Sequence, residues 1–317
     1  MDPQLQAFRE AGERAVRFQL QYQQPDGSFI WDPSIRDAYH KQPYSWGISG
    51  YLPEAQRLLS WIAANTLQAD GSLRDYNGDV YKQSWFFQGC HRLGRFDLSY
   101  PVMGWLLAQQ KSCGGFPHFA ADDRLRALAT AWTGISALYF GRLDVARRAA
   151  DWCMTLLNQP DPTRFYFQTT PAGELLTTAL DPSAQFVDLA GVEQPYWEIA
   201  LPWMLMLRLW EATGEEHWLT RAEEFFVEHY LACGADRFAC TGSGKGSLAA
   251  ALHYRHTGDK RARDGAIEFG EYLLATERPE GGWRGPTEPD TLLIYIDHAA
   301  EYNVWLQEVA AILASVG

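Results

Sequence analysis

Apolar residues recur along this chain at the three- and four-residue spacing of α-helices. In the first block, Phe8, Ala11, Ala15 and Phe18 fall on one helical stripe. Further blocks follow in pairs, and a last apolar block ends the chain. The spacing therefore predicts about twelve helices. The helices named from the pattern are residues 3–24, 80–91, 98–110, 125–139, 145–157, 196–211, 217–232, 247–256, 261–276 and 296–315.

A short turn sequence with a glycine and a final apolar residue separates the helix pairs. The copies lie at residues 23–29, 68–73, 109–116, 158–165, 233–238 and 278–283. Their final apolar residues are 43 to 49 residues apart, except for one interval of 73 residues. That interval contains a polar, proline-bearing insertion at about 166–192. Glycine and proline end helices and Asp caps turns, so each interval fits two helices and a turn.

The helix that follows each turn is apolar on all sides, whereas the helix that precedes the next turn carries charge on one face. Helices that are apolar all round are buried, and one-faced helices lie outside them. The sequence therefore predicts an all-α fold, an (α/α)6 barrel or toroid of six helical hairpins. The first and last helices pair to close the ring, and residues 1–317 form one domain. An irregular helical solenoid is the alternative.

The repeated Gln-x-x-Asp-Gly-Ser-Phe and Gly-Gly-Phe/Trp turns resemble those of the terpenoid cyclase and protein prenyltransferase α/α toroid superfamily. The resemblance covers the whole chain and concerns its fold. The catalytic signatures of that superfamily are mostly absent. Asp-x-Asp-Asp does not occur, because Asp122-Asp123 is the only aspartate pair, and it is followed by Arg124-Leu125-Arg126. The separation of Cys240 and His298 resembles the zinc-dependent transferases, but no Asp stands two residues before Cys240, so no metal and no cofactor is implied.

The long non-helical stretches all follow a turn and precede an inner helix, which in a toroid gathers them at one mouth. We expect the active site there, at the N-termini of the inner helices. Glu198 begins an inner helix with little other charge, so burial is expected to raise its pKa as a general acid requires. The alternative is a structural carboxylate bonded to an arginine or to a helix N-terminus.

Two further groups of acid and base side chains are expected at this mouth. Asp297 and His298 begin the last inner helix, where Glu301 lies one turn from Asp297 on the same face. Asp37, Tyr39 and His40 lie in the longest early loop. The alternatives are a first-turn acid cap and a loop held by its own hydrogen bonds. The residues predicted to bind substrate are Trp31, Tyr44, Trp46, His91, Tyr166, Tyr196, Trp197, Trp283 and Tyr302.

Composition and charge exclude several classes of protein. A formal net charge of −12 argues against nucleic-acid binding, which needs clustered Lys and Arg. No apolar run is long enough for a membrane span, and the N-terminus lacks the pattern of a secretory signal. The five cysteines are scattered and odd in number. These features predict a cytoplasmic protein with a small-molecule substrate, and they leave the oligomeric state open.

Three functions are compatible with these residues. The main hypothesis is a metal-independent lyase, isomerase or cyclase that acts by acid–base catalysis on a small apolar substrate, isoprenoid-like or polyketide-like. Aromatic walls that stabilise a carbocation support it. The alternative is a carbohydrate-active (α/α)6 enzyme, either an epimerase, a lyase or a hydrolase, since Trp and Tyr stack on sugar faces. The second alternative is a non-catalytic binding scaffold.

Overall fold

A computed structural model of the chain describes residues 2–29, 39–178 and 185–316. Within these residues the chain forms twelve α-helices and four short β-strands. Among them, no helix combines the length and the apolar composition that crossing a membrane requires. The α-helices are α1 (Pro3–Leu20), α2 (Gln42–Ile48), α3 (Leu52–Asn65), α4 (Val80–Arg92), α5 (Phe96–Leu107), α6 (Ala127–Tyr139), α7 (Leu143–Thr155), α8 (Trp197–Thr213), α9 (Glu216–Glu224), α10 (Gly244–Thr257), α11 (Lys260–Thr276) and α12 (Leu292–Ser315).

The chain divides into two compact units. Unit 1 consists of Met1–Gly78, Lys82–Trp105 and Ala266–Gly317, and unit 2 consists of Asp79–Tyr81 and Leu106–Gly265. Each unit is described below by itself.

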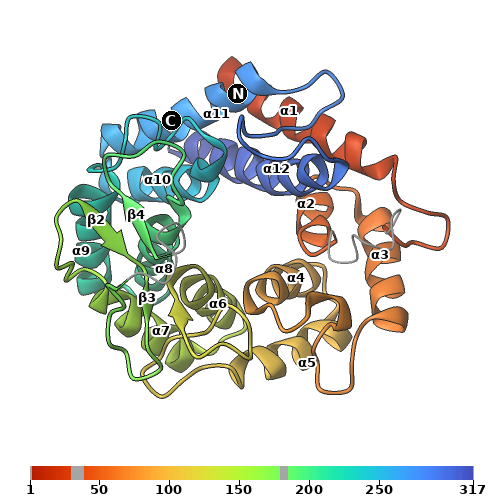
Figure 1. Ribbon diagram of the computed structural model, residues 1–317. Helices are drawn as coiled ribbons and strands as arrows, with labels where there is room; N and C mark the ends of the chain where they lie inside the picture. The colour runs from red at the N-terminus through yellow and green to blue at the C-terminus, as the bar shows by residue number, and fades with distance from the viewer. Residues whose placement is uncertain (1, 30–38, 179–184, 317) are drawn as a thin grey trace. The chain divides into compact units, whose positions relative to one another are not determined.

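In unit 1 the first and last helices of the chain pack along each other, as the sequence predicts (Figure 1). Asp2 caps α1 by accepting the Gln4 N–H, and the buried stripe contains the predicted Phe8, Ala11 and Ala15. A Cβ atom at Gly12 would lie 2.5 Å from Asn303 Oδ1, so glycine permits the close approach of α12. Helix α12 begins at Leu292, four residues before the predicted start, because the apolar run 292–294 continues the helix.

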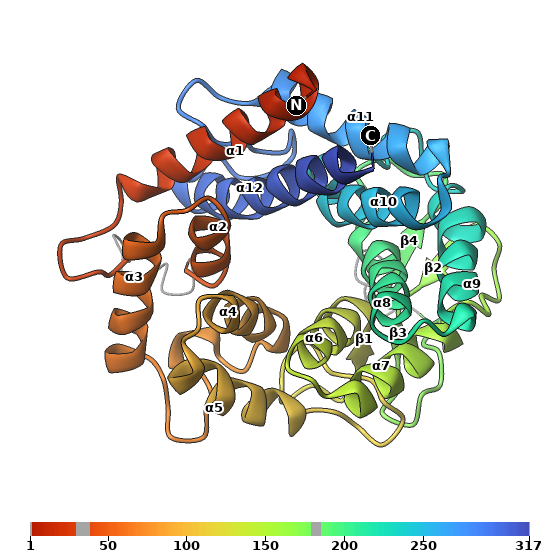
Figure 2. The ribbon, with the colours of Figure 1, turned by 180° about the vertical axis from the view of Figure 1, so that it is seen from behind.

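In unit 2, helix α8 packs against both α6 and α10 (Figure 2). Residues Ala127–Ala137 of α6 are all buried, whereas α7 buries one face, in agreement with the predicted two kinds of helix. The helix predicted at 217–232 is α9 followed by one π-helical stretch, Phe225–Tyr230.

The insertion predicted at about 166–192 contributes strands rather than helices. β1 (Leu125–Arg126) pairs antiparallel with β3 (Gln168–Thr169), and β2 (Arg164–Tyr166) pairs with β4 (Phe186–Asp188). The first of these pairs holds Arg126 in extended backbone directly before α6.

Four of the six copies of the repeated turn share one backbone conformation and one kind of packing contact. In the copies with Gly27, Gly71, Gly114 and Gly281, φ lies between +88° and +99°. A Cβ atom at each glycine would lie 2.0–2.7 Å from a backbone carbonyl oxygen of a neighbouring helix of the same unit. Positive φ and this close contact both require glycine, which explains why the residue recurs in the sequence.

Candidate functional site

A buried lysine in unit 1 joins two carboxylates of the last helix. Lys41 directly precedes α2, and its Nζ lies 2.7 Å from Asp297 Oδ2 and 2.6 Å from Glu301 Oε2. His40 Nε2 lies 3.8 Å from Asp297 Oδ1. We call these four residues the lysine cluster. The side chain of Asp297 is 31% exposed, whereas those of Lys41 and Glu301 are 5% and 8% exposed.

Lys41 and Asp297 of the lysine cluster keep each other ionised. Burial lowers the pKa of Lys41, but Asp297 and Glu301 outweigh it, so the pKa of Lys41 is raised. Burial raises the pKa of Asp297, but Lys41 and His40 outweigh it, so the pKa of Asp297 is lowered. The exposed part of Asp297 therefore presents a carboxylate, which accepts hydrogen bonds and protons.

Two tryptophan rings lie beside the lysine cluster. Lys41 Nζ lies 5.9 Å from the centre of the Trp85 ring, which packs against Trp305 at 5.3 Å. Trp305 Nε1 donates a hydrogen bond to Glu301 Oε1. Glu301 therefore accepts from both Lys41 and Trp305 and is buried. Asp297 is ionised as well, but part of its carboxylate is exposed to solvent.

Unit 2 contains a second group of charged residues, which comes from four separate segments. Glu198 is fully buried at the start of α8. It accepts hydrogen bonds from Arg126 Nε at 2.8 Å and from the Leu128 N–H at 2.9 Å, and Arg126 Nη2 lies 2.7 Å from it. Trp197 Nε1 donates to the same carboxylate. Glu198 is therefore bonded to both an arginine and a helix N-terminus.

The remaining nitrogen of Arg126 reaches a histidine. Arg126 Nη1 lies 3.2 Å from His118 Nδ1, and His118 Nε2 lies 3.5 Å from Oδ2 of the buried Asp79. We call Asp79, His118, Arg126 and Glu198 the arginine cluster. Because guanidinium only donates, Nδ1 of neutral His118 presents its lone pair and Nε2 carries the proton toward Asp79.

The arginine cluster also has aromatic faces. The ring of Phe119 stacks on His118 at 4.7 Å and is 41% exposed, and the guanidinium of Arg126 lies 5.2 Å from the Phe167 ring. Lys245 Nζ lies 5.8 Å from the ring centres of Tyr81 and of Trp197. Cationic and aromatic groups thus alternate in this part of unit 2.

The other predicted catalytic residues have separate partners. Tyr39 is buried and donates its hydroxyl hydrogen bond to Asp75 Oδ2 at 2.8 Å. His298 Nε2 lies 3.3 Å from Glu288 Oε1, and its Nδ1 lies 3.3 Å from the Trp283 carbonyl oxygen. Burial raises the pKa of Glu288, but His298 outweighs it, so that pKa is lowered. Asp37 lies outside the described residues.

Of the residues predicted to bind substrate, Trp197 lies at a cluster, and Trp31 lies outside the described residues. Several of the others contact buried backbone or side-chain groups. Trp46 Nε1 donates to Gln19 Oε1, and Trp283 Nε1 donates to the Leu273 carbonyl. Further contacts join Tyr44 to Glu308, His91 to Ser99, Tyr166 to Phe186, Tyr196 to Asp236 and Tyr302 to His298.

The sequence places Asp79 and His118 in loops at the predicted mouth without indicating a role for either, and it does not indicate Lys41 or Arg126 as site residues. Lys41 follows the predicted site residue His40 in sequence, and Arg126 directly precedes α6, which is buried from Ala127 to Ala137. The signal that could have identified Lys41 is a charged residue beside a predicted site residue. The signal for Arg126 is a charged residue at the start of an apolar helix.

Among the described residues, one group has the spacing of a cation site. Glu223, His253 and Asp259 bring their ligand atoms within 4.8 Å of one another. However, His253 Nδ1 accepts a hydrogen bond from Trp203 Nε1, which places the His253 proton on the nitrogen that faces Glu223. Metal binding needs a lone pair there, and burial lowers the pKa of His253 to about 4, so the arrangement fits a neutral histidine facing a carboxylate better than a metal site.

Neither a protein-family model nor a curated protein matches the sequence. Solved structures do match in fold. A D-mannose isomerase has 13% identity, with a TM-score of 0.66 over 94% of this chain and 96% of that chain. A second match is an α-1,6-mannanase of Salegentibacter sp. in complex with α-1,6-mannotriose. That protein is an inactive variant in which two neighbouring aspartates are replaced. It has 15% identity and a TM-score of 0.66 over 96% of this chain and 99% of that chain.

A type II terpene cyclase from Scytonema, in complex with geranylgeranyl dihydroxybenzoate, also matches. It has 14% identity and a TM-score of 0.61 over 98% of this chain and 99% of that chain. These similarities confirm the (α/α)6 toroid fold class and the fold-level resemblance to the terpenoid cyclases.

Proposed function

We propose that this chain is a carbohydrate-active enzyme that isomerises or epimerises a small sugar by proton transfer. The observation that carries this proposal is His118, whose Nδ1 presents a lone pair while Asp79 faces its Nε2. A neutral imidazole oriented by a carboxylate is an efficient base near neutral pH. The proposal favours the carbohydrate alternative over the small apolar substrate of the main hypothesis.

In the proposed reaction, His118 Nδ1 removes the proton from the carbon beside the sugar carbonyl. Before this step, Arg126 Nη1 moves its hydrogen bond from His118 Nδ1 to the carbonyl oxygen, which frees the Nδ1 lone pair and stabilises the oxygen that gains negative charge. The C–H electron pair forms the double bond of an enediolate. Return of the proton to the adjacent carbon, together with transfer of the hydroxyl proton from one enediolate oxygen to the other, gives an isomer. Return of the proton to the opposite face of the original carbon gives an epimer.

Glu198 is a positioning residue in this scheme rather than the general acid. It binds Nε and Nη2 of Arg126, so that Nη1 is the nitrogen left to reach a substrate oxygen. Asp79 holds the tautomer of His118. Tyr81 and Phe119 provide apolar ring faces for the C–H face of a sugar.

The state of the carboxylates supports a sugar rather than an isoprenoid. Cyclisation that begins by protonating an alkene needs a carboxyl group in its neutral form. Asp297 is kept ionised by Lys41 and His40, and Glu198 is bonded to Arg126. Two of the three similar structures described above belong to proteins that act on mannose or mannan.

The test is the interconversion of D-mannose and D-fructose in D2O, followed by proton NMR. We expect conversion with deuterium incorporated beside the carbonyl carbon. His118→Asn is expected to lower kcat/KM by about 100- to 10,000-fold, the usual contribution of a general base. The matched control is His217→Asn, which replaces an exposed histidine of α9. This variant should convert mannose at the wild-type rate.

A second experiment separates the two clusters. If the base is His118, Asp297→Asn should leave deuterium incorporation close to the wild-type rate. If Asp297→Asn abolishes deuterium incorporation and His118→Asn does not, the base belongs to the lysine cluster. Absence of any exchange on mannose and on the other aldohexoses contradicts the proposed function.

Hydrolysis of a mannan is a second candidate function, favoured by the only adjacent aspartates of the chain. Asp122 and Asp123 lie in the loop between His118 and Arg126, and Asp122 Oδ2 accepts the Phe119 N–H at 3.1 Å. The similar mannanase is inactive when two neighbouring aspartates are replaced. Release of mannose from α-1,6-mannotriose, lost in Asp122→Asn and Asp123→Asn, would favour hydrolysis over isomerisation.

A further inference from the structure

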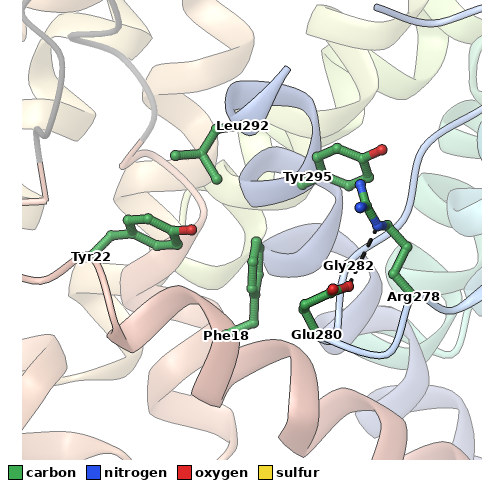
Figure 3. A pocket seen from close by; sticks show the side chains of 7 residues that line it. All are labelled: Phe18, Tyr22, Arg278, Glu280, Gly282, Leu292 and Tyr295. Atoms are coloured by element: carbon green, nitrogen blue, oxygen red, sulfur yellow. Dashed lines mark ion pairs between the residues drawn. The ribbon is translucent and has the colours of Figure 1, made fainter. Parts of the chain in front are cut away.

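Unit 1 contains a pocket distinct from both charged clusters. It lies between the end of α1, the turn at 278–282 and the start of α12, and its volume is about 270 Å³ (Figure 3). It is lined by Phe18, Tyr22, Arg278, Glu280, Gly282, Leu292 and Tyr295. Pockets for drug-sized ligands hold about 300–1,000 Å³, so this one has room for a single ring.

The walls of the pocket are mainly apolar and aromatic. Phe18 and Tyr22 meet edge to face at 5.7 Å, and Leu292 and Tyr295 extend from the first turn of α12 (Figure 3). Phe18 and Tyr295 are 8% and 9% exposed. These rings offer apolar faces to a ligand of matching shape.

One side of the pocket carries a pair of opposite charges. The Arg278 guanidinium lies 4.3 Å from the centre of the Tyr295 ring, and its Nε lies 3.5 Å from Glu280 Oε2. Arg278 Nη1 lies 3.9 Å from Asp290 Oδ1. Charge-assisted hydrogen bonds are about 2.7–2.9 Å long, so both pairs leave hydrogen-bonding capacity for a ligand.

The absence of a side chain at residue 282 keeps the pocket open. A Cβ atom at Gly282 would lie 3.4 Å from Tyr295 and 3.6 Å from Phe18, so it would touch the two rings of the walls. Gly282 does not have the positive φ of its neighbour Gly281, so its backbone accepts other residues. Glycine therefore provides space here rather than a turn conformation.

We propose that this pocket binds one neutral pyranose ring, separately from the reaction centre. A pyranose has an apolar C–H face for the aromatic rings and hydroxyls that both donate and accept. Its hydroxyls donate to Glu280 and accept from Arg278. The carboxylates of Glu280 and Asp290 would repel an anion. A purely apolar ring would form no hydrogen bonds with Arg278 and Glu280.

The test measures binding of methyl α-D-mannopyranoside by saturation-transfer NMR. This glycoside has no free carbonyl, so the proposed isomerase cannot convert it. We expect saturable binding that weakens at least about 10-fold in Tyr22→Ala, which removes one wall. Glu280→Gln should weaken it as well. Tyr100→Ala, which removes an exposed tyrosine of α5 outside the pocket, is the matched control.

A graded series at residue 282 tests the place of binding without removing a ligand-contacting group. Gly282→Ala should bind nearly as wild type, because its Cβ makes ordinary contacts, and Gly282→Val should lose binding. Circular dichroism checks that each variant is folded. Unchanged binding in Gly282→Val and Tyr22→Ala overturns the proposal, and so does tighter binding of benzoate than of the glycoside. Failure of sugar isomerisation, with this binding intact, rejects only the proposed function.

Discussion

The two charged clusters use their carboxylates in opposite ways. In the lysine cluster one cation serves two carboxylates, and the carboxylate of Asp297 is partly exposed. In the arginine cluster the carboxylate of Glu198 binds two nitrogens of the Arg126 guanidinium, and its side chain is fully buried. The first arrangement leaves a carboxylate available to a ligand. In the second arrangement the carboxylate of Glu198 holds the guanidinium of Arg126 in place, and a ligand can then bind that guanidinium.

This difference shows that burial alone does not make a carboxyl group a general acid. The sequence places Glu198 in an apolar helix, where an isolated carboxyl would be protonated. In the structure, the buried carboxylate of Glu198 instead accepts hydrogen bonds from Arg126, the Leu128 N–H and Trp197, which take the place of water. The number of donors around each carboxylate therefore decides its role, and variants that remove donors test the comparison.

The largest effect on stability is expected in the arginine cluster. Arg126→Met leaves the charge of Glu198 buried without its cation, and the free energy of unfolding should fall by about 3–5 kcal/mol. Urea denaturation at pH 7 measures it. Glu198→Gln keeps an acceptor for the Leu128 N–H and removes the charge.

The double variant Arg126→Met with Glu198→Gln is the control for this prediction. It should lose clearly less stability than the sum of the two single variants, with a coupling energy of at least about 1 kcal/mol. Additive losses would mean that the two side chains do not depend on each other, contrary to the distances in unit 2.

A smaller loss is expected from the corresponding change in the lysine cluster. Lys41→Met removes the cation shared by Asp297 and Glu301, but Asp297 can be hydrated. We therefore expect a loss of about 2 kcal/mol, below the usual cost of a fully buried unpaired charge. The same denaturation experiment measures it, and Lys41→Arg should restore part of the loss. A loss as large as that of Arg126→Met would contradict the proposed difference between the clusters.

The fold follows from the sequence because its signals are local. The turn glycines recur where a positive φ and a close carbonyl require them, and helical periodicity distinguishes α6 from α7. The pairing of the first and last helices was also predicted, since each lacks a hairpin partner next to it in sequence.

The candidate site was only partly predictable, because its contacts join distant segments. The spacing of Asp297 and Glu301 indicates one helix face, and the structure places both on Lys41. Lys41 is 256 residues from Asp297, and Arg126 is 72 residues from Glu198. Periodicity and capping describe neighbours along the chain, so they do not reveal which cation meets which carboxylate.

The smallest expected effect concerns the pH dependence of Asp297. Lys41 and His40 hold its pKa in the folded protein below the ordinary value, although burial acts in the other direction. The ionised side chain therefore stabilises the fold at a pH above the pKa in the unfolded chain, about 3.9. That contribution is lost as the pH falls through the lower pKa of the folded state. Asp297→Asn lacks it at every pH.

The difference in free energy of unfolding between wild type and Asp297→Asn should consequently be constant above about pH 5 and shrink below pH 4. We expect about 1 kcal/mol or less, since the side chain is partly hydrated. Urea titrations of both proteins from pH 3 to pH 7 measure the difference, in which the other carboxylates cancel. A difference that grows as the pH falls would show that Asp297 is held neutral, and the contrast between the two clusters would then be wrong.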